Sequence, residues 1–505
     1  MQNPDNKNIR KSLVRRRPFV FIFIGLFVLT VGGYYLRPVD NSWEVQFRNV
    51  GTNSSPRTVD LNGDGILDIV LGAGGEEYDT TDYAVMALDG RNGKLLWRVS
   101  GPNQVVGSAV FKDITQDGVP DVFIGGRTAQ LYAIDGRTGK ILWQFLHDYT
   151  PTDLYTDTVL LNFFNPQFIP DQNGDGVEDI IAAFGGFVHA KPYDPDRPPG
   201  QLLVLDALTG SIITRAYMPD GNETYMSPVV YDFGDGGGVS VLFGTGGETL
   251  VGNFYRIRLN DLMTTGMKNA VLIDSGFQKG FIAPPVLIDI TQDKVRDIVI
   301  TSMDGVMRTY DGSDFHRLWI TTIHPRAEVQ SMQVPLYFDD DDIPDFFGIF
   351  NVGEWPANDT TIHAIVSGKD GRELFRDTLG MLQSCSPVLL DYDEDSYYDV
   401  VYPVNTVQQT GILDLYRNQL MLYDGRTGKR TALDSVVYGK NLGSTPLIAD
   451  LDQDGKVDIV YTFMTQRDQF ITYRHLVVKR IELDIRLKQN PWGAYMGTNY
   501  TSVFP

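Results

Sequence analysis

A nine-residue acidic segment that recurs along the chain constrains the fold more than any other feature. Its first copy, Asp60-Leu-Asn-Gly-Asp-Gly-Ile-Leu-Asp68, has side-chain oxygens at positions one, three and five, glycine at position six and aspartate at position nine. Alternating oxygens followed by a glycine that can adopt a positive φ are typical of calcium loops. The apolar residues after Asp68 indicate that this loop joins two β-strands.

Seven further copies follow at near-regular spacing, and they begin at Asp113, Asp171, Asp232, Asp289, Asp339, Asp391 and Asp450. Two of them carry Lys294 or Ser396 in place of the glycine, which predicts weaker metal binding. The copy at Asp232 has no closing carboxylate and is expected to be metal-free. The copy at Asp339 is interpreted as two residues short, so its sequence does not define a ligand geometry.

Six copies therefore predict Ca²⁺ sites, with ligands at positions one, three, five and nine. The predicted ligands are Asp60, Asn62, Asp64, Asp68, Asp113, Thr115, Asp117, Asp121, Asp171, Asn173, Asp175, Asp179, Asp289, Thr291, Asp293, Asp297, Asp391, Asp393, Asp395, Asp399, Asp450, Asp452, Asp454 and Asp458.

Each repeat also predicts four strands. A short apolar segment precedes the loop and another follows it. A hairpin then turns through a sequence such as Asp89-Gly-Arg-Asn-Gly93. The Asp and Gly of this turn are expected to supply left-handed conformations. Four-stranded units of about fifty residues predict an all-β chain, an eight-bladed β-propeller over residues 43–505.

The positions of the tryptophans predict how the blades join. Trp97, Trp143 and Trp319 fall on outermost strands, where a large ring can pack against the next blade. Trp43 precedes the first loop at the spacing by which Trp97 precedes the second, so residues 43–48 are expected to form the outermost strand of the last blade. Residues 484–505 are interpreted as a tail over that junction.

Residues 18–36 contain no charged side chain and are long enough to cross a bilayer as one helix. Basic residues concentrate before this segment, which predicts a cytoplasmic basic segment over 1–17 and a signal anchor over 18–36. A cleavable signal peptide is the alternative. In both cases the propeller is expected outside the cytoplasm, in a periplasm or at a cell surface.

The chain has 64 acidic and 43 basic residues, a net charge of −21. Such a surface repels nucleic acid, so no nucleic-acid partner is expected. The one cysteine, Cys385, cannot form an intramolecular disulfide and is interpreted as a buried core thiol.

Two families of repeats are similar to this sequence. Asp60-Leu-Asn-Gly-Asp-Gly-Ile-Leu-Asp-Ile-Val-Leu-Gly-Ala-Gly74 resembles the FG-GAP repeat of integrin α-subunit heads, whose loops bind calcium. Gln130-Leu-Tyr-Ala-Ile-Asp-Gly-Arg-Thr-Gly-Lys-Ile-Leu-Trp143 resembles the repeat of pyrroloquinoline-quinone (PQQ) propellers. An anchor followed by a propeller also resembles the FG-GAP-containing type II membrane proteins of animals. The resemblance implies a propeller fold and calcium loops rather than an activity.

The strong motifs are all structural, which favours a non-enzymatic, calcium-binding scaffold or binding module with a protein or glycan partner on one propeller face. A polysaccharide lyase or another glycan-active enzyme is the alternative. Such an enzyme needs basic residues at the axial cleft, and the six histidines share no repeat position. A quinone-dependent dehydrogenase is disfavoured because many members use an adjacent cysteine pair.

Overall fold

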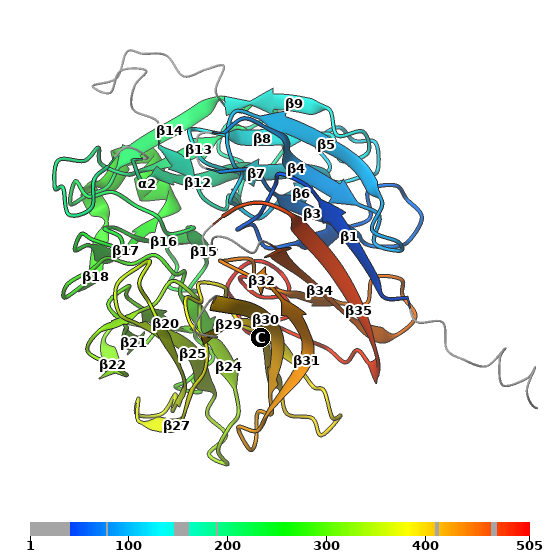
Figure 1. Ribbon diagram of the computed structural model, residues 1–505. Helices are drawn as coiled ribbons and strands as arrows, with labels where there is room; N and C mark the ends of the chain where they lie inside the picture. Colours follow the sequence, from blue (N-terminus) through cyan, green and yellow to red (C-terminus); the bar gives the residue numbers. More distant parts are fainter. Residues whose placement is uncertain (1–40, 77–78, 146–160, 188–189, 410–413, 466–471) are drawn as a thin grey trace, which may run out of the picture. The chain divides into compact units, whose positions relative to one another are not determined.

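The computed structural model describes residues 41–76, 79–145, 161–187, 190–409, 414–465 and 472–505. Residues from Ser42 to Pro505 form one structural unit, in which eight antiparallel sheets follow one another around a common centre (Figure 1). We number these sheets as blades 1–8. The predicted span at 18–36 lies outside the described residues, and no helix within them is long and apolar enough to cross a bilayer.

The first four blades each run from an inner to an outer strand in chain order. Blade 1 contains β2 (Arg57–Val59), β3 (Asp68–Gly72), β4 (Thr81–Leu88) and β5 (Leu95–Gly101). Blade 2 contains β6 (Val110–Lys112), β7 (Asp121–Gly125), β8 (Leu131–Ile134) and β9 (Ile141–Gln144). Blade 3 contains β10 (Asn162–Phe163), β11 (Gln167–Ile169), β12 (Asp179–Gly185), β13 (Gln201–Leu205) and β14 (Ile212–Tyr217). Blade 4 contains β15 (Val229–Tyr231), β16 (Ser240–Gly244), β17 (Asn253–Arg258) and β18 (Val271–Ser275), with α2 (Leu259–Thr265) and η2 (Gly266–Asn269) before its last strand.

The remaining blades repeat this plan. Blade 5 contains β19 (Val286–Ile288), β20 (Asp297–Thr301), β21 (Val306–Tyr310) and β22 (Arg317–Thr322). Blade 6 contains β23 (Ala327–Glu328), β24 (Val334–Leu336), β25 (Asp345–Val352), β26 (Thr360–Val366) and β27 (Glu373–Thr378). Blade 7 contains β28 (Val388–Leu390), β29 (Asp399–Gln409), β30 (Asp414–Tyr423) and β31 (Arg430–Val437). Blade 8 contains β32 (Gly439–Lys440), β33 (Leu447–Ala449), β34 (Lys456–Thr465), β35 (Leu476–Arg486) and β1 (Trp43–Phe47).

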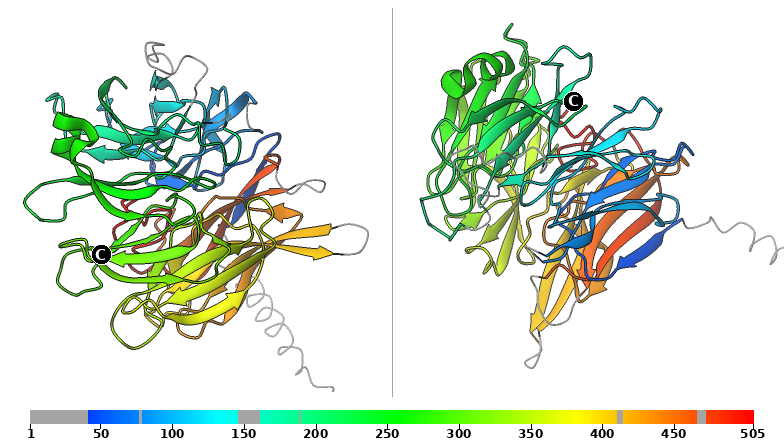
Figure 2. Two further views of the ribbon diagram at one scale, coloured as in Figure 1. Left: turned by 90° about the vertical axis from the view of Figure 1, so that its left-hand side faces the viewer. Right: turned by 90° about the horizontal axis from the view of Figure 1, so that it is seen from above.

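The core lies between successive blades, and every junction is filled by buried apolar side chains. Separate clusters join blades 1 and 2, 2 and 3, 3 and 4, 7 and 8, and 8 and 1, while one larger cluster spans blades 4 to 7. The second strands are buried on both faces because each lies between two such clusters. The ring is therefore continuous. Figure 2 shows the blades from two further sides. This confirms the predicted eight-bladed propeller of four-stranded blades.

The two ends of the propeller sequence pair with each other. β1 lies antiparallel to β35, with Trp43 opposite Arg480 and Phe47 opposite Leu476. The N–H of Thr445 in blade 8 also donates to the hydroxyl of Ser55 in blade 1, at 3.0 Å. These contacts confirm that the N-terminal strand completes the last blade and closes the ring.

The tryptophans also occupy the predicted places. The Trp97 indole N–H donates to the carbonyl of Gly136 in the next blade at 2.7 Å, and Trp319 makes the same bond to Gly368 at 2.6 Å. Trp43 repeats it across the junction of blades 8 and 1, to Gly90 at 3.0 Å. Each indole therefore locks the outer strand of one blade onto the turn of its neighbour.

The C-terminal segment reaches farther than the predicted tail over one junction. Residues 487–505 run along the free edges of inner strands and bond to the main chain of Leu389 in blade 7, Ile448 in blade 8 and Leu287 in blade 5. In blade 1, the Arg57 guanidinium lies 4.0 Å from the ring centroid of Tyr500. The prediction was too narrow because unpaired inner strand edges face the segment on several sides of the channel, and their N–H groups need acceptors.

Exchange of Trp43 and Phe47 for alanine is expected to destabilise the protein, because both half-buried rings pack across the closing junction. We expect a loss of about 2 kcal/mol per side chain, measured by urea unfolding. The matched control exchanges Glu44 and Gln46, whose side chains point outward from the same strand, and should stay within about 0.5 kcal/mol. Equal effects of the two pairs would contradict closure by β1.

Candidate functional site

The acidic loops fold as predicted into turns whose oxygens point inward. In the first loop, the carboxylate of Asp60 accepts hydrogen bonds from Gly63 and Gly65, at 2.7 and 3.0 Å. Asn62 and Asp64 each accept a bond from the backbone two residues on, both at 2.9 Å. Position six has a positive φ in all six predicted sites, and the residues there are Gly65, Gly118, Gly176, Lys294, Ser396 and Gly455.

The structure brings the early loop positions together. The carboxylates of Asp391, Asp393 and Asp395 offer atoms within 4.8 Å of one another, and those of Asp450, Asp452 and Asp454 do the same. One oxygen of Asp391, a residue 7% exposed, is buried without a hydrogen-bond partner. Hard oxygen donors grouped in this way fit Ca²⁺. In these two loops, the oxygens of positions one, three and five therefore converge.

Position nine differs from the prediction in its surroundings. In each of seven blades the aspartate at this position is buried, and one of its oxygens accepts a bond from the backbone of loop position two. These aspartates are Asp68, Asp121, Asp179, Asp297, Asp345, Asp399 and Asp458. The groups with converging carboxylates do not include them. The aspartate at position nine therefore fixes the loop backbone through this hydrogen bond.

In blades 1, 2, 5, 6 and 7, the second oxygen of the same aspartate accepts a bond from the hairpin turn. The N–H of Gly90 donates to Asp68 at 3.2 Å, and the N–H of Gly425 donates to Asp399 at 2.9 Å. Gly90 and Gly425 do not adopt a positive φ, so the predicted left-handed conformation is wrong for this glycine of the turn. The second glycine of the turn, such as Gly93, does adopt a positive φ. The first glycine of the turn cannot carry a side chain, because an added Cβ at Gly90 would lie 1.9 Å from the carbonyl oxygen of Leu67.

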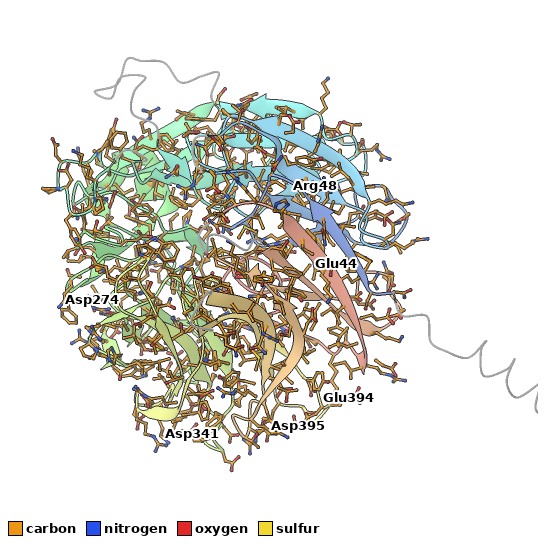
Figure 3. All side chains as sticks on the ribbon, in the orientation of Figure 1. Glu44, Arg48, Asp274, Asp341, Glu394 and Asp395 are labelled. Carbon is orange, nitrogen blue, oxygen red and sulfur yellow. The ribbon has the colours of Figure 1, made fainter. Side chains whose placement is uncertain are left out.

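The sixth loop is not short, which is a second correction. Its closing residue is Asp345, and the N–H of Phe338 donates to that carboxylate as position two does elsewhere. The nonapeptide therefore begins at Tyr337, which replaces the first aspartate. The sequence concealed this register because a run of aspartates follows from Asp339. Asp341 of this loop and Asp395 of the seventh lie at the lower edge of the view in Figure 3.

The other three blades lack this bond to a turn glycine: blade 3 leaves Asp179 Oδ1 buried without a hydrogen-bond partner among the described residues, and blades 4 and 8 use a buried arginine instead. In blade 8, Arg480 donates to Asp458 and to Asp452, both at 2.7 Å. In blade 4, Arg256 makes the corresponding bonds to Ser240 and Asp235, at 2.9 and 2.6 Å. Both arginines lie on the third strand, opposite the residue two places after position nine. A guanidinium therefore already neutralises part of these two loops.

A second candidate site was not predicted at the level of residues. A cavity of about 430 Å³ lies on the propeller axis, and residues from all eight blades line it. A second space of about 160 Å³ shares much of this lining and is also lined by Tyr495 of the C-terminal segment. Because the lining residues precede the inner strands or follow the second strands, the cavity lies at the ends of these strands opposite the acidic loops.

Two ion pairs lie around this cavity. Arg197 and Glu223 form a buried ion pair at 2.6 Å, and Lys279 pairs with Glu328. Glu248 faces Gln330, whose amide donates to it at 3.0 Å. Burial and then Glu328 raise the pKa of Glu248, while Lys279 and Arg127 partly offset this. The region is thus polar but balanced in charge.

Five aromatic residues complete the wall, and they are Phe164, Phe187, Tyr225, Trp355 and Tyr473. Tyr225 donates its hydroxyl to Glu223 at 3.0 Å, and Asn53 donates its amide to Tyr473 at 2.8 Å. The other amide atom, Asn53 Oδ1, is buried and accepts no bond from a described residue. Sequence reasoning missed this site because its residues come from loops outside the repeated motif.

Comparison with known proteins supports the fold. The model of the FAM234A/B beta-propeller family matches residues 53–185, and no curated protein matches the chain. A europium-containing methanol dehydrogenase is 12% identical, with a TM-score of 0.56 over 86% of this chain and 92% of that chain. Sqt1 of Saccharomyces cerevisiae is 10% identical, with a TM-score of 0.52 over 88% and 100%.

A quinohemoprotein alcohol dehydrogenase of Pseudomonas putida HK5 is also similar, with 12% identity and a TM-score of 0.50 over 90% of this chain and 79% of that chain. At such identity these similarities establish a β-propeller and no activity. The chain is therefore a propeller protein whose first two blades and the start of the third resemble the FAM234A/B propeller.

Exchange of Asp68 for alanine in metal-free protein is expected to lower the free energy of unfolding by about 1–3 kcal/mol, because two buried N–H groups lose their acceptor. The control is Asp64→Ala at position five of the same loop, where the side chain is exposed. Urea unfolding in the absence of divalent ions measures both. A neutral Asp68 variant would contradict the backbone-holding role.

The unchanged protein and its Asp68→Ala variant also give a pH test. Burial raises the pKa of Asp68 to about 6, above its value in an unfolded chain, so the folded state binds the proton more tightly. Its contribution is therefore complete at low pH and declines as the pH rises through 6. Without metal, the stability advantage over Asp68→Ala should fall by on the order of 2 kcal/mol between pH 4 and 7. A rising advantage would show the opposite sign and refute the assignment.

Proposed function

We propose that this chain is a non-enzymatic binding module, an extracytoplasmic propeller on a single-pass anchor formed by residues 18–36. The axial cavity carries the proposal, since all eight blades line it and Tyr495 of the C-terminal segment lines the space next to it. Two ion pairs lie beside it, Arg197 with Glu223 and Lys279 with Glu328, and charges compensated in this way suit recognition more than proton transfer. Nucleic acid is not a partner, given the acidic balance of the chain.

The loops supply the second part of the proposal, that Ca²⁺ stabilises the blades. Their grouped carboxylates and positive-φ turns support it, as does the FG-GAP resemblance of the segment from Asp60. Among the described residues, no arginine or lysine pairs with the first, third or fifth position of the loops at Asp171 and Asp289, whereas Asp452 pairs with Arg480. Calcium therefore acts as a structural ion that offsets repulsion within each loop, and it takes no part in chemistry.

Proximity labelling on intact cells tests the binding role and the location together. The full chain is fused to a labelling enzyme at the C-terminal side, and a variant with Glu248→Gln serves as the comparison. Extracellular or periplasmic neighbours that depend on Glu248 support the proposal. Labelling confined to cytoplasmic proteins would contradict the predicted topology.

Calcium is expected to raise the melting temperature of the full chain in detergent, and EDTA should reverse the increase. Each filled site contributes RT ln(1 + [Ca²⁺]/Kd), about 2.7 kcal/mol at a hundredfold excess over Kd. A double exchange, Asp171→Asn with Asp175→Asn, should remove part of this gain. Asp232→Asn, in the loop expected to be metal-free, is the matched control and should leave the gain intact.

A further inference from the structure

We propose that the axial cavity binds a neutral saccharide, an uncharged ligand that combines many hydroxyl groups with apolar C–H faces. The inference rests on the proposed binding function and names the chemical class of its ligand. Four properties of the cavity support a neutral saccharide: its charge, its hydrogen-bonding groups, its aromatic walls and its size.

Charge argues against a strongly ionic ligand. An anion would meet Glu248 with Glu223 and Glu328 close by, while a cation would meet Arg127 and Lys279. The ion pairs of Glu223 and Glu328 already compensate two of these carboxylates within the protein. A ligand without net charge disturbs none of these pairs, so its binding avoids an uncompensated buried charge.

The hydrogen-bonding groups are of both kinds. Glu248 uses one oxygen for Gln330, and no described residue donates to the other. Asn53 Oδ1 is a buried acceptor without a donor among the described residues, and Trp355, whose indole N–H is a donor, lines the same cavity. A sugar hydroxyl is at once donor and acceptor, so one ligand can satisfy groups of both types, which desolvation would otherwise penalise.

Aromatic walls and size complete the match. Trp355 and Tyr473 pack together against the apolar cluster of Leu382, Leu442 and Met464 while lining the cavity. Rings fixed from behind in this way offer flat apolar faces to the C–H side of a pyranose. About 430 Å³ lies within the range of small-molecule sites, and the smaller adjoining space has Tyr495 of the C-terminal segment in its lining.

The test applies the full chain in detergent micelles to an array of neutral, sialylated and sulfated oligosaccharides, with trimethyl-lysine peptides as cationic probes. Binding to neutral oligosaccharides is expected, and calorimetry with methyl glycosides of neutral hexoses and N-acetylhexosamines gives its affinity. Glu248→Gln should weaken binding about tenfold, since an acceptor with a full charge is lost. Trp355→Ala should weaken it at least tenfold.

Phe277→Ala is the matched aromatic control, because Phe277 is 63% exposed and does not line the cavity. The affinity of the Phe277→Ala variant for the neutral saccharides should equal that of the unchanged chain. Should Trp355→Ala fail to fold, the Glu248→Gln variant alone decides the outcome, since it keeps the shape of the side chain and its contact with Gln330.

The remaining outcomes separate this inference from the proposed function. Binding only to sialylated or sulfated oligosaccharides, or only to trimethyl-lysine peptides, would overturn the neutral class and leave a binding module. Neutral binding that Glu248→Gln and Trp355→Ala leave unchanged would place the ligand elsewhere. Shortened oligosaccharides in the mass spectrum after incubation would overturn the non-enzymatic function while retaining the ligand class.

Discussion

The structure depends on a glycine of the hairpin turn whose N–H and carbonyl bond in two directions, an arrangement that is complete in blades 1, 2 and 6. The N–H of Gly90 donates to Asp68 of its own blade, while its carbonyl accepts from Trp43 of the blade before it. Gly136 repeats the pair with Asp121 and Trp97. The loop, the turn and the neighbouring blade therefore form one hydrogen-bonded unit, and the absence of a side chain at the glycine is what lets the three approach.

Much of this arrangement could be predicted because it repeats. The period of the acidic segments gave the number of blades, and the position of Trp43 gave the closure of the ring. The role of position nine could not be read from spacing, since a carboxylate that binds metal and one that binds backbone N–H groups have the same sequence. Only the buried partners of Asp68 distinguish the two.

The register of the sixth loop and the axial cavity show where such reasoning ends. Tyr337 stands in the first position of that loop, so a search for the leading aspartate selects Asp339 instead. The cavity is assembled from single residues such as Glu248 and Trp355, each in a connection that differs from its counterparts in other blades. Their proximity follows from ring closure, which composition and periodicity do not describe at the level of side chains.

The C-terminal segment links blades that are not neighbours in the ring. It is bonded to Leu287 in blade 5 and to Leu389 and Ile448 in blades 7 and 8, and Tyr500 lies against Arg57 of blade 1. A ring of blades held only by contacts between neighbours can flatten into an ellipse without breaking any of them. A segment that is bonded to several blades across the ring resists that deformation. The width of the central opening is therefore set by the length of this segment as well as by the blades.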